Sequence, residues 1–525
     1  MRLRHRNLKI VSIWATLILL LLAGGGWWFY NSRDARAYEI AAEAQMALQA
    51  GNLFEARTGF LEAISRKDDV PAFYLQLGRT NFQLGEMVAA YSAFNAAYSL
   101  DPDNPEAMLA VAQLGVQVGD IEASKEATRR LILRDSRFVP ALVLQGVHNM
   151  LGRNYGDAIK NADEALAIDP ANEEALILKI RATFLKGDAA GARSLLEENV
   201  ASDTSNVGLA MTELEVYREL GDAERMSEIF GKLRQLQPDN REVLLDEAHL
   251  QYKLDNPERA NEITIATLTD DEVEPEEISA AMRLLRLYAD PVAIARSVPR
   301  LRREANEDTR IEMAKYLAEN DQPSPAKILM EGVTGNEALT FEALLALDQG
   351  QPAKALAITN PILENDDSNC YAQFLRARAQ LDTGKIQPAI LSGQTAVTEC
   401  PSLLEGWVML ARAYDRAGKD IQAERVFEQG IEFNPQEPTL ARSYSDWLIA
   451  KKRPREAIAV ARKIARLMPA YTPVWEDYAA LCGKYSPACV AQAQTGIEES
   501  RKIYGLDPPP GERANAGLFG RFLIR

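Results

Sequence analysis

Residues 98–112 have the sequence YSLDPDNPEAMLAVA, in which one apolar run stops at Asp101-Pro102 and another starts at Pro105. Two similar stretches follow at equal intervals along the chain, LAIDPANEEALILKI (166–180) and RQLQPDNREVLLDEA (234–248). Proline ends a helix because it lacks the N–H group and its ring clashes with the preceding turn. The stretch therefore predicts a boundary between two helices that recurs along the chain.

Glycines that suit a turn recur at a regular spacing. They are Gly51, Gly85, Gly119, Gly187 and Gly221, with Gly152 one residue early at the skipped place and Asp255 continuing the series. Glycine adopts left-handed dihedrals without a Cβ penalty, so it is favoured just after a helix ends. A small residue that lets helices approach closely follows each turn, at Ala56, Ala90, Ala158, Ala192 and Ala260, with Ser124 and Met226 as exceptions.

A repeating unit of about 34 residues with this glycine, this small residue and a closing proline resembles the tetratricopeptide repeat. The pattern returns in the second half of the chain, with Ala355, Ala389, Ala423, Ala457 and Ala491 at the same position. The resemblance implies an all-α fold, a right-handed superhelix of about 14 antiparallel helix pairs with a concave groove lined by the first helix of each pair. It also implies binding of peptides or proteins, no enzyme activity and no cofactor.

The repeat pattern weakens in the middle of the chain. The stretch at 275–308 lacks the turn glycine, and the unit at 309–335 is shorter than the others. We therefore predict an N-terminal lobe, a joint of degenerate repeats with the weakest interface of the array, a C-terminal lobe and a tail. Their ranges are 37–270, 271–335, 336–505 and 506–525.

The N-terminal segment predicts a membrane anchor. Residues 1–9 form a basic tail, and residues 10–30 carry no charge, rise ~31 Å as a helix and end near Trp27, Trp28 and Tyr30. The positive-inside rule places the N-terminus in the cytoplasm, so we expect a single-pass inner-membrane protein with periplasmic repeats. A cleaved signal peptide is the alternative, although bulky Trp27-Trp28 follow the only small-residue cluster.

Composition excludes other classes of function. The net charge is −16, and the N-terminal segment through Arg36 is basic, so the remainder is still more acidic. Such a body repels phosphate backbones, which argues against nucleic acid as a ligand. The sequence contains no HExxH, P-loop, GxSxG or dinucleotide motif, and we expect no catalytic, cofactor-binding or metal-binding residues.

The candidate peptide groove follows from positions 5, 9 and 12 of the repeats. Its residues are Leu75, Arg79, Phe82, Leu109, Val143, Ile177, Arg181, Phe184, Met211 and Leu245. An apolar floor with guanidinium groups suits an extended or helical peptide that carries acidic residues. The alternative is that much of this stripe, above all position 12, packs against the neighbouring repeat.

The four cysteines form two candidate disulfides. Cys370 and Cys400 lie at opposite ends of one helix pair, which an antiparallel arrangement brings together, and Cys482 and Cys489 flank one hairpin turn. Disulfides suit an extracytoplasmic compartment, whereas the alternative is four buried thiols that act as small hydrophobic residues.

The leading hypothesis is a non-enzymatic scaffold for protein–protein interactions, anchored in the bacterial inner membrane and involved in envelope or exopolysaccharide biogenesis or export. The alternative is a periplasmic chaperone or carrier that holds unfolded or lipid-modified clients in the groove. The tail after the last helix carries three prolines and an apolar tip, and it either caps the last repeat or docks on a partner.

Overall fold

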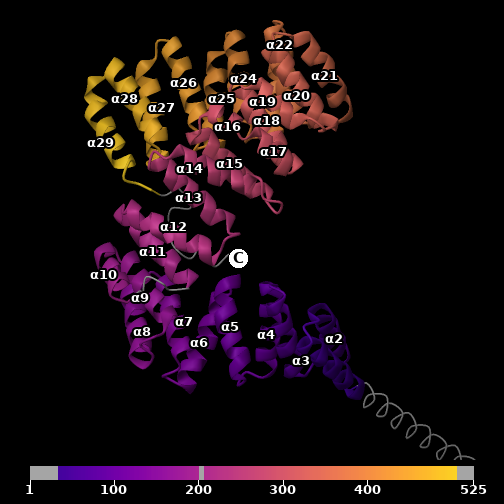
Figure 1. Ribbon diagram of the computed structural model, residues 1–525, viewed down its shortest axis with the longest axis vertical. Coiled ribbons are helices and arrows are strands. Elements are labelled where there is room, and N and C mark those ends of the chain that lie inside the picture. The colour runs from indigo at the N-terminus through magenta and orange to yellow at the C-terminus, as the bar shows by residue number, and fades with distance from the viewer. Residues whose placement is uncertain (1–33, 200–205, 505–525) are drawn as a thin grey trace, which may run out of the picture. The chain divides into compact units, whose positions relative to one another are not determined.

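The computed structural model describes residues 34–199 and 206–504, and this part of the chain is all-helical without a β-strand. It divides into two compact units, unit 1 with the described residues 34–199 and unit 2 with 206–504 (Figure 1). The predicted transmembrane helix at 10–30, the basic tail at 1–9 and the tail at 506–525 lie outside the described residues.

Unit 1 contains five helix pairs. Its helices are residues 34–49 with α2 (Leu53–Arg66), α3 (Pro71–Gln83) with α4 (Met87–Leu100), α5 (Pro105–Val118) with α6 (Ile121–Arg134), α7 (Val139–Leu151) with α8 (Tyr155–Ile168), and α9 (Glu173–Leu185) with α10 (Ala189–Asn199).

Unit 2 contains nine pairs, so the described chain holds the fourteen that the sequence predicts. The first pairs are α11 (Val207–Leu220) with α12 (Ala223–Leu236), α13 (Arg241–Lys253) with α14 (Pro257–Leu268), α15 (Pro275–Tyr288) with α16 (Pro291–Ala295) and α17 (Val298–Glu304), and α18 (Glu307–Glu319) with α19 (Pro323–Met330). The others are α20 (Gly335–Asp348) with α21 (Pro352–Asn365), α22 (Cys370–Asp382) with α23 (Ile386–Glu399), α24 (Leu404–Arg416) with α25 (Asp420–Phe433), α26 (Pro438–Ala450) with α27 (Pro454–Leu467), and α28 (Thr472–Tyr485) with α29 (Val490–Ser500).

The boundary in residues 98–112 forms as the sequence predicts. Helix α4 ends at Leu100, and the Asp101 N–H still donates to Ala97 O. The side chain of Asn104 accepts hydrogen bonds from two backbone N–H groups of the first turn of α5, and Pro105 occupies the first position of that helix, where no N–H is needed. One helix is therefore stopped and the next is capped within a few residues.

Left-handed residues occupy the turns at the predicted interval. The φ angles are positive at Gly51, Gly85, Gly119, Arg153, Gly187, Gly221 and Asp255, and again at Gly350, Gly384, Gly418 and Lys452. Gly152, which lies one residue early in the sequence, has a φ of −77°, and Arg153 takes the left-handed conformation with a φ of 60°. The geometry of the turn is therefore kept even where glycine is absent.

Small residues let the paired helices approach closely. The alanine after each turn is fully buried at Ala56, Ala90, Ala158, Ala192, Ala260, Ala355, Ala389, Ala423 and Ala457. A Cβ at Gly146 in α7 would overlap Leu178 and approach Asn161 Cβ at 3.2 Å. In the last pair Ala491 is exposed and Ala493 is buried instead, because the short 3₁₀ helix Pro487–Cys489 shifts the register.

The exception at Ser124 is explained by a buried polar pair. Ser124 Oγ lies 2.8 Å from His148 Nε2, and both side chains are buried. Burial lowers the pKa of His148 to about 4, so the imidazole is neutral at physiological pH. The hydroxyl thus satisfies a histidine that alanine would leave without this partner.

The first helices of the pairs form the inner side of each curved array. Neighbouring first helices contact one another directly, as α5 with α7 and α7 with α9 in unit 1, and α20 with α22 and α22 with α24 in unit 2. The second helices in these parts of the described chain make no comparable contact. First helices that lie closer together than second helices curve the array with the first helices on the concave side.

The degenerate repeats at 271–335 are continuous with the rest of unit 2. Their second helices are short, since α16, α17 and α19 have 5, 7 and 8 residues. Their buried side chains nevertheless belong to the same hydrophobic core as residues from α13 to α28, with Met282, Leu301 and Leu329 fully or almost fully buried. The division of the described chain into two units lies near residue 200.

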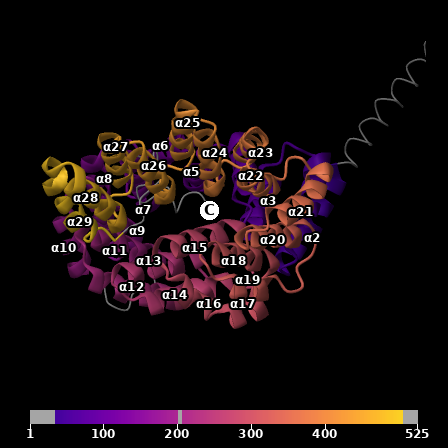
Figure 2. The ribbon, with the colours of Figure 1, turned by 90° about the horizontal axis from the view of Figure 1, so that it is seen from above.

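Unit 2 closes on itself. Lys253 Nζ, at the end of α13, donates to Ala470 O (2.6 Å) and Ser500 O (2.8 Å), which lie before α28 and at the end of α29. Tyr471 Oη donates to Leu287 O (2.7 Å). These bonds join the first two of the eight pairs from α13 to α29 to the last pair, and the eight pairs lie around a closed turn in Figure 2.

Candidate functional site

The inner face of unit 1 carries eight of the ten predicted groove residues. Leu75, Leu109, Ile177 and Phe184 are half-buried on the first helices, and Phe82 is 51% exposed. Val143 is buried, so it belongs to the core rather than to the surface. The exposed and half-buried members of this set therefore present an apolar surface on α3, α5 and α9.

The two predicted arginines of unit 1 differ in their surroundings. The exposed Arg79 on α3 forms a two-point ion pair with Glu106 on α5. Arg181 is buried, with only 7% of its surface exposed. Arg79 thus ties neighbouring first helices together, and neither arginine stands as an isolated cation on this face.

The other two predicted groove residues belong to unit 2. Met211 is half-buried on α11, and Leu245 is buried on α13 within the core. The alternative for position 12 was that its side chains pack against the neighbouring repeat. In several repeats the residue at position 12 is indeed buried, as at Val116, Met150 and Tyr252. The ten residues therefore do not form one continuous surface.

A cleft opens on the inner face of unit 2 between α26 and α28. Its cavity volume is about 300 Å³, and α27 contributes to its floor. The apolar lining consists of Pro438, Ala441, Ala461, Ile464, Val474, Ala480 and Leu481, and the polar lining of Arg442, Ser445, Asp446 and Asp477. Arg442 Nε donates to Asp477 Oδ2 at 2.5 Å.

This cleft was not predicted from the sequence. Arg442 and Asp446 occupy positions 5 and 9 of their repeat, the same positions that define the groove residues predicted in the first half of the chain. The departure from an apolar residue at position 5 was the available signal. The depth of the cleft depends on the packing of three helices, which no single repeat contains.

A second hollow lies over α23, α24 and α25. Its volume is about 590 Å³, and its aromatic lining includes Trp407, Tyr414 and Phe433. Trp407 and Phe433 stack with ring centroids 5.7 Å apart, and Trp407 Nε1 donates to Pro401 O. The second helices contribute more polar side chains to the lining of this hollow than to the lining of the α26–α28 cleft.

Charged groups line the inner side of the closed turn in unit 2. Enclosure of Glu319 on this inner side, together with repulsion from Glu405 and Glu312, raises the pKa of Glu319, while Arg286 and Lys315 oppose the shift. Tyr371 Oη donates to Glu319 Oε1 at 3.4 Å. These groups come from α15, α18, α22 and α24. The inner side of the closed turn is therefore polar, whereas the inner face of unit 1 is mostly apolar.

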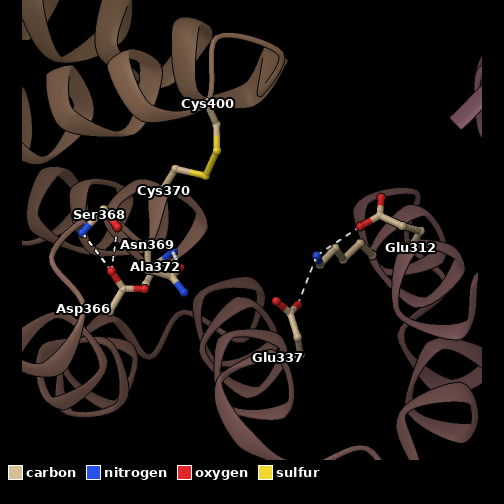
Figure 3. Close-up of a disulfide and its surroundings, with 9 residues drawn as sticks. Glu312, Glu337, Asp366, Ser368, Asn369, Cys370, Ala372 and Cys400 are labelled. Atoms are coloured by element: carbon tan, nitrogen blue, oxygen red, sulfur yellow. Dashed lines mark hydrogen bonds and ion pairs between the residues drawn. A yellow bond between two sulfur atoms is a disulfide. The ribbon is translucent and has the colours of Figure 1, made fainter. Parts of the chain in front are cut away.

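The structure joins both predicted cysteine pairs as disulfides. Cys370 and Cys400 have Cα atoms 5.8 Å apart, and Cys482 and Cys489 have Cα atoms 5.5 Å apart. Figure 3 shows the first disulfide, which joins Cys370 at the start of α22 to Cys400, and the carboxylates of Glu312 and Glu337, each of which pairs with Lys315 at 3.2 Å. Each disulfide closes one helix pair at its ends.

Two kinds of feature are absent from residues 34–199 and 206–504. None of the helices there has the length and hydropathy needed to cross a bilayer. In the same ranges no three or more His, Cys, Asp or Glu side chains are grouped so that they would hold a metal ion.

Sequence and structure comparisons identify related proteins. Tetratricopeptide repeat protein 33 of Xenopus laevis is 24% identical over 170 residues, which are 32% of this chain and 65% of that protein. A tetratricopeptide repeat protein from Parabacteroides merdae superposes with a TM-score of 0.40 at 16% identity, covering 47% of this chain and 98% of that one. A thermophilic TPR protein from Thermus thermophilus has a TM-score of 0.32 at 18% identity, covering 34% and 98%.

Family models described as "Tetratricopeptide repeat" match both units. One matches residues 34–105 in unit 1 and 342–403 in unit 2, and another matches residues 404–437. These ranges contain the turn residues and buried alanines described above. Residues 34–105 and 342–437 of this chain are therefore tetratricopeptide repeats.

Proposed function

We propose that this chain is a non-enzymatic scaffold that binds other proteins along the inner face of its first helices. The observation that carries the proposal is the pairing of tetratricopeptide repeats with an inner face that leaves apolar side chains such as Phe82 and Leu75 partly exposed. Curved repeat arrays use such concave surfaces to bind extended or helical segments.

The scaffold is proposed to be anchored in the bacterial inner membrane with its repeats in the periplasm. The uncharged stretch at 10–30 and the basic residues before it support the anchor and its orientation. The two disulfide pairs support an oxidising compartment. We further propose a role in envelope or exopolysaccharide biogenesis or export, where an anchored scaffold can gather components at the membrane.

A pair of reporter fusions tests the topology. A reporter that is active only in the periplasm, fused after residue 525, is expected to be active, and a reporter active only in the cytoplasm is expected to be silent. The reverse result would contradict the orientation.

Site-specific photocrosslinking in cells tests the interaction surface. A photoreactive amino acid at Phe82, on the first helix α3, is expected to capture a partner, whereas the same group at Leu133, which is 73% exposed on the second helix α6, is not. Equal capture at both positions would contradict binding at the inner face.

The same experiment distinguishes the alternative function. The apolar character of the unit 1 inner face also favours a periplasmic chaperone or carrier for unfolded or lipid-modified clients. A scaffold is expected to give one or a few discrete crosslinked species at Phe82. A carrier is expected to give a broad set of client proteins.

A further inference from the structure

The α26–α28 cleft has an apolar interior and an acidic rim. Arg442 and Asp477 neutralise each other through their ion pair. Asp446 is exposed, and among the described residues it makes no hydrogen bond or ion pair. The rim therefore carries one negative charge that is not compensated, beside a hollow lined by aliphatic side chains. Such a site suits apolar side chains that are followed by a basic residue.

The segment after the last helix has this chemistry. Residues 514–525, ANAGLFGRFLIR, contain Leu518, Phe519, Phe522, Leu523 and Ile524 as large apolar residues, and Arg521 and Arg525 as the only charged side chains. Three consecutive prolines at 508–510 prevent α29 from continuing into this segment. So many apolar side chains close together in the sequence are costly to leave in water.

The segment starts close to the cleft. Ser500, the last residue of α29, donates through Oγ to Thr472 Oγ1 (3.0 Å), and Thr472 is the first residue of α28. Asp477 in the cleft lies further along α28, a rise of ~7.5 Å from Thr472. Residues 505–517 between the described structure and Leu518 span up to ~43 Å when extended. The segment can therefore reach the cleft within the same molecule.

We propose that residues 518–525 dock in the α26–α28 cleft, with Phe519 or Phe522 in the apolar interior and an arginine at Asp446. The inference goes beyond the proposed function, because it concerns the chain without any partner. A linker of this length gives an effective concentration of about 1 mM. A protein partner that uses the cleft must therefore displace the segment, which makes the cleft a regulated part of the inner face.

Hydrogen–deuterium exchange of the full chain tests the docking directly. The variant Phe519→Asp/Phe522→Asp removes the apolar anchors without touching the described helices. It is expected to speed exchange in 438–446 and 474–481, which line the cleft, and to leave unit 1 unchanged. Unchanged exchange at the cleft would overturn the proposal, and so would a change confined to α29 or to unit 1, which would locate the segment elsewhere.

A labelled peptide of residues 514–525 supplies a second measurement. If the free peptide binds with a Kd of about 0.1 mM, the tethered segment makes its binding to the native chain roughly tenfold weaker than to the double variant. Adding Asp446→Arg to the double variant is expected to weaken peptide binding by about twofold to fivefold, as for loss of an exposed ion pair. The control Asp367→Arg, at an exposed aspartate before α22, is expected to have no effect.

Equal peptide binding by the native chain and the double variant would overturn the docking within one molecule. If the Asp446 and Asp367 substitutions weakened peptide binding equally, the proposed pairing of an arginine of the segment with Asp446 would be overturned. Neither result depends on a protein partner, so failure here is distinguishable from failure of the proposed scaffold.

Discussion

The closure of unit 2 predicts that Lys253→Met opens the turn. Lys253 Nζ donates to two carbonyl oxygens, Ala470 O at 2.6 Å and Ser500 O at 2.8 Å. The second belongs to the last residue of α29, where the helix dipole favours a cation. Methionine keeps the length and apolar volume of the side chain but removes the ammonium group, and with it both of these bonds.

The expected decrease in the free energy of opening the turn follows from the kind of hydrogen bond that is removed. A hydrogen bond to a charged group contributes about 1.5–3 kcal/mol, which sets an upper limit of about 3–6 kcal/mol for two. Lys253 is only half-buried, so water replaces part of what is lost, and we expect about 2 kcal/mol. The bond from Tyr471 Oη to Leu287 O remains, and so does a second one from Arg283 on α15 to Gln436 Oε1 (2.8 Å), just before α26. An opening free energy that is lower by about 2 kcal/mol corresponds to roughly 30-fold faster exchange of the amides it protects.

Hydrogen–deuterium exchange of the full chain is the assay. In Lys253→Met, the amides of α28 and α29 are expected to exchange roughly 30-fold faster, while those of α5 and α7 in unit 1 keep their rates. Lys327→Met, at an exposed lysine on α19, serves as the matched control. It is expected to leave the exchange rates unchanged both in α28 and α29 and in α5 and α7. Native-like protection of α28 and α29 in Lys253→Met would refute the reasoning that these bonds hold the turn closed.

Four further predictions concern the packing and the chemistry of the units. Gly146→Ala is expected to destabilise unit 1 by about 1–3 kcal/mol through overpacking, whereas Gly156→Ala, with open space around its Cβ, is expected to stabilise it by about 0.5–1 kcal/mol, both measured by urea unfolding. Burial lowers the pKa of His249 to about 3, so unit 2 is expected to lose stability as the pH falls from about 6.5 towards 3, where the unfolded state binds the proton first; a His249→Gln variant with the same pH dependence would contradict this. Protein purified from its native compartment is expected to gain no mass from thiol alkylation before reduction and four adducts after it, and four adducts without reduction would refute both disulfides. Limited proteolysis is expected to leave residues 271–335 as resistant as the neighbouring repeats, because they share one core; a first cut there would show that the joint predicted from the sequence is the weakest interface after all.

The local structure of this chain could be predicted from its sequence because each repeat carries its own signals. Turn residues, small residues and prolines act within a single repeat, so the pairs, the helix start at Pro105 and the left-handed turns follow directly. One exception obeys the same local rule, because Arg153 takes the left-handed position in place of the displaced Gly152. The other exception does not, because Ser124 replaces alanine where His148 of the next repeat needs a partner.

Features that depend on distant repeats could not be predicted in this way. The bond from Lys253 to Ala470 joins residues 217 apart, and nothing in either repeat shows that eight pairs complete a turn. For the same reason the missing turn glycine at 275–308 indicated a weak joint, although long-range packing keeps that stretch in the core. The α26–α28 cleft likewise arises from three helices of two repeats.

The closed turn also restricts how the length of this chain can change. Repeat arrays grow and shrink by whole units, and in unit 1, whose five pairs are joined in line, an added pair would find a neighbour on each side. In unit 2 an additional pair between α20 and α25 would displace the last pair from Lys253 and part the bonds that close the turn. We therefore expect insertions and deletions of one whole repeat to be tolerated in unit 1, whereas the closed turn from α13 to α29 requires a fixed number of repeats.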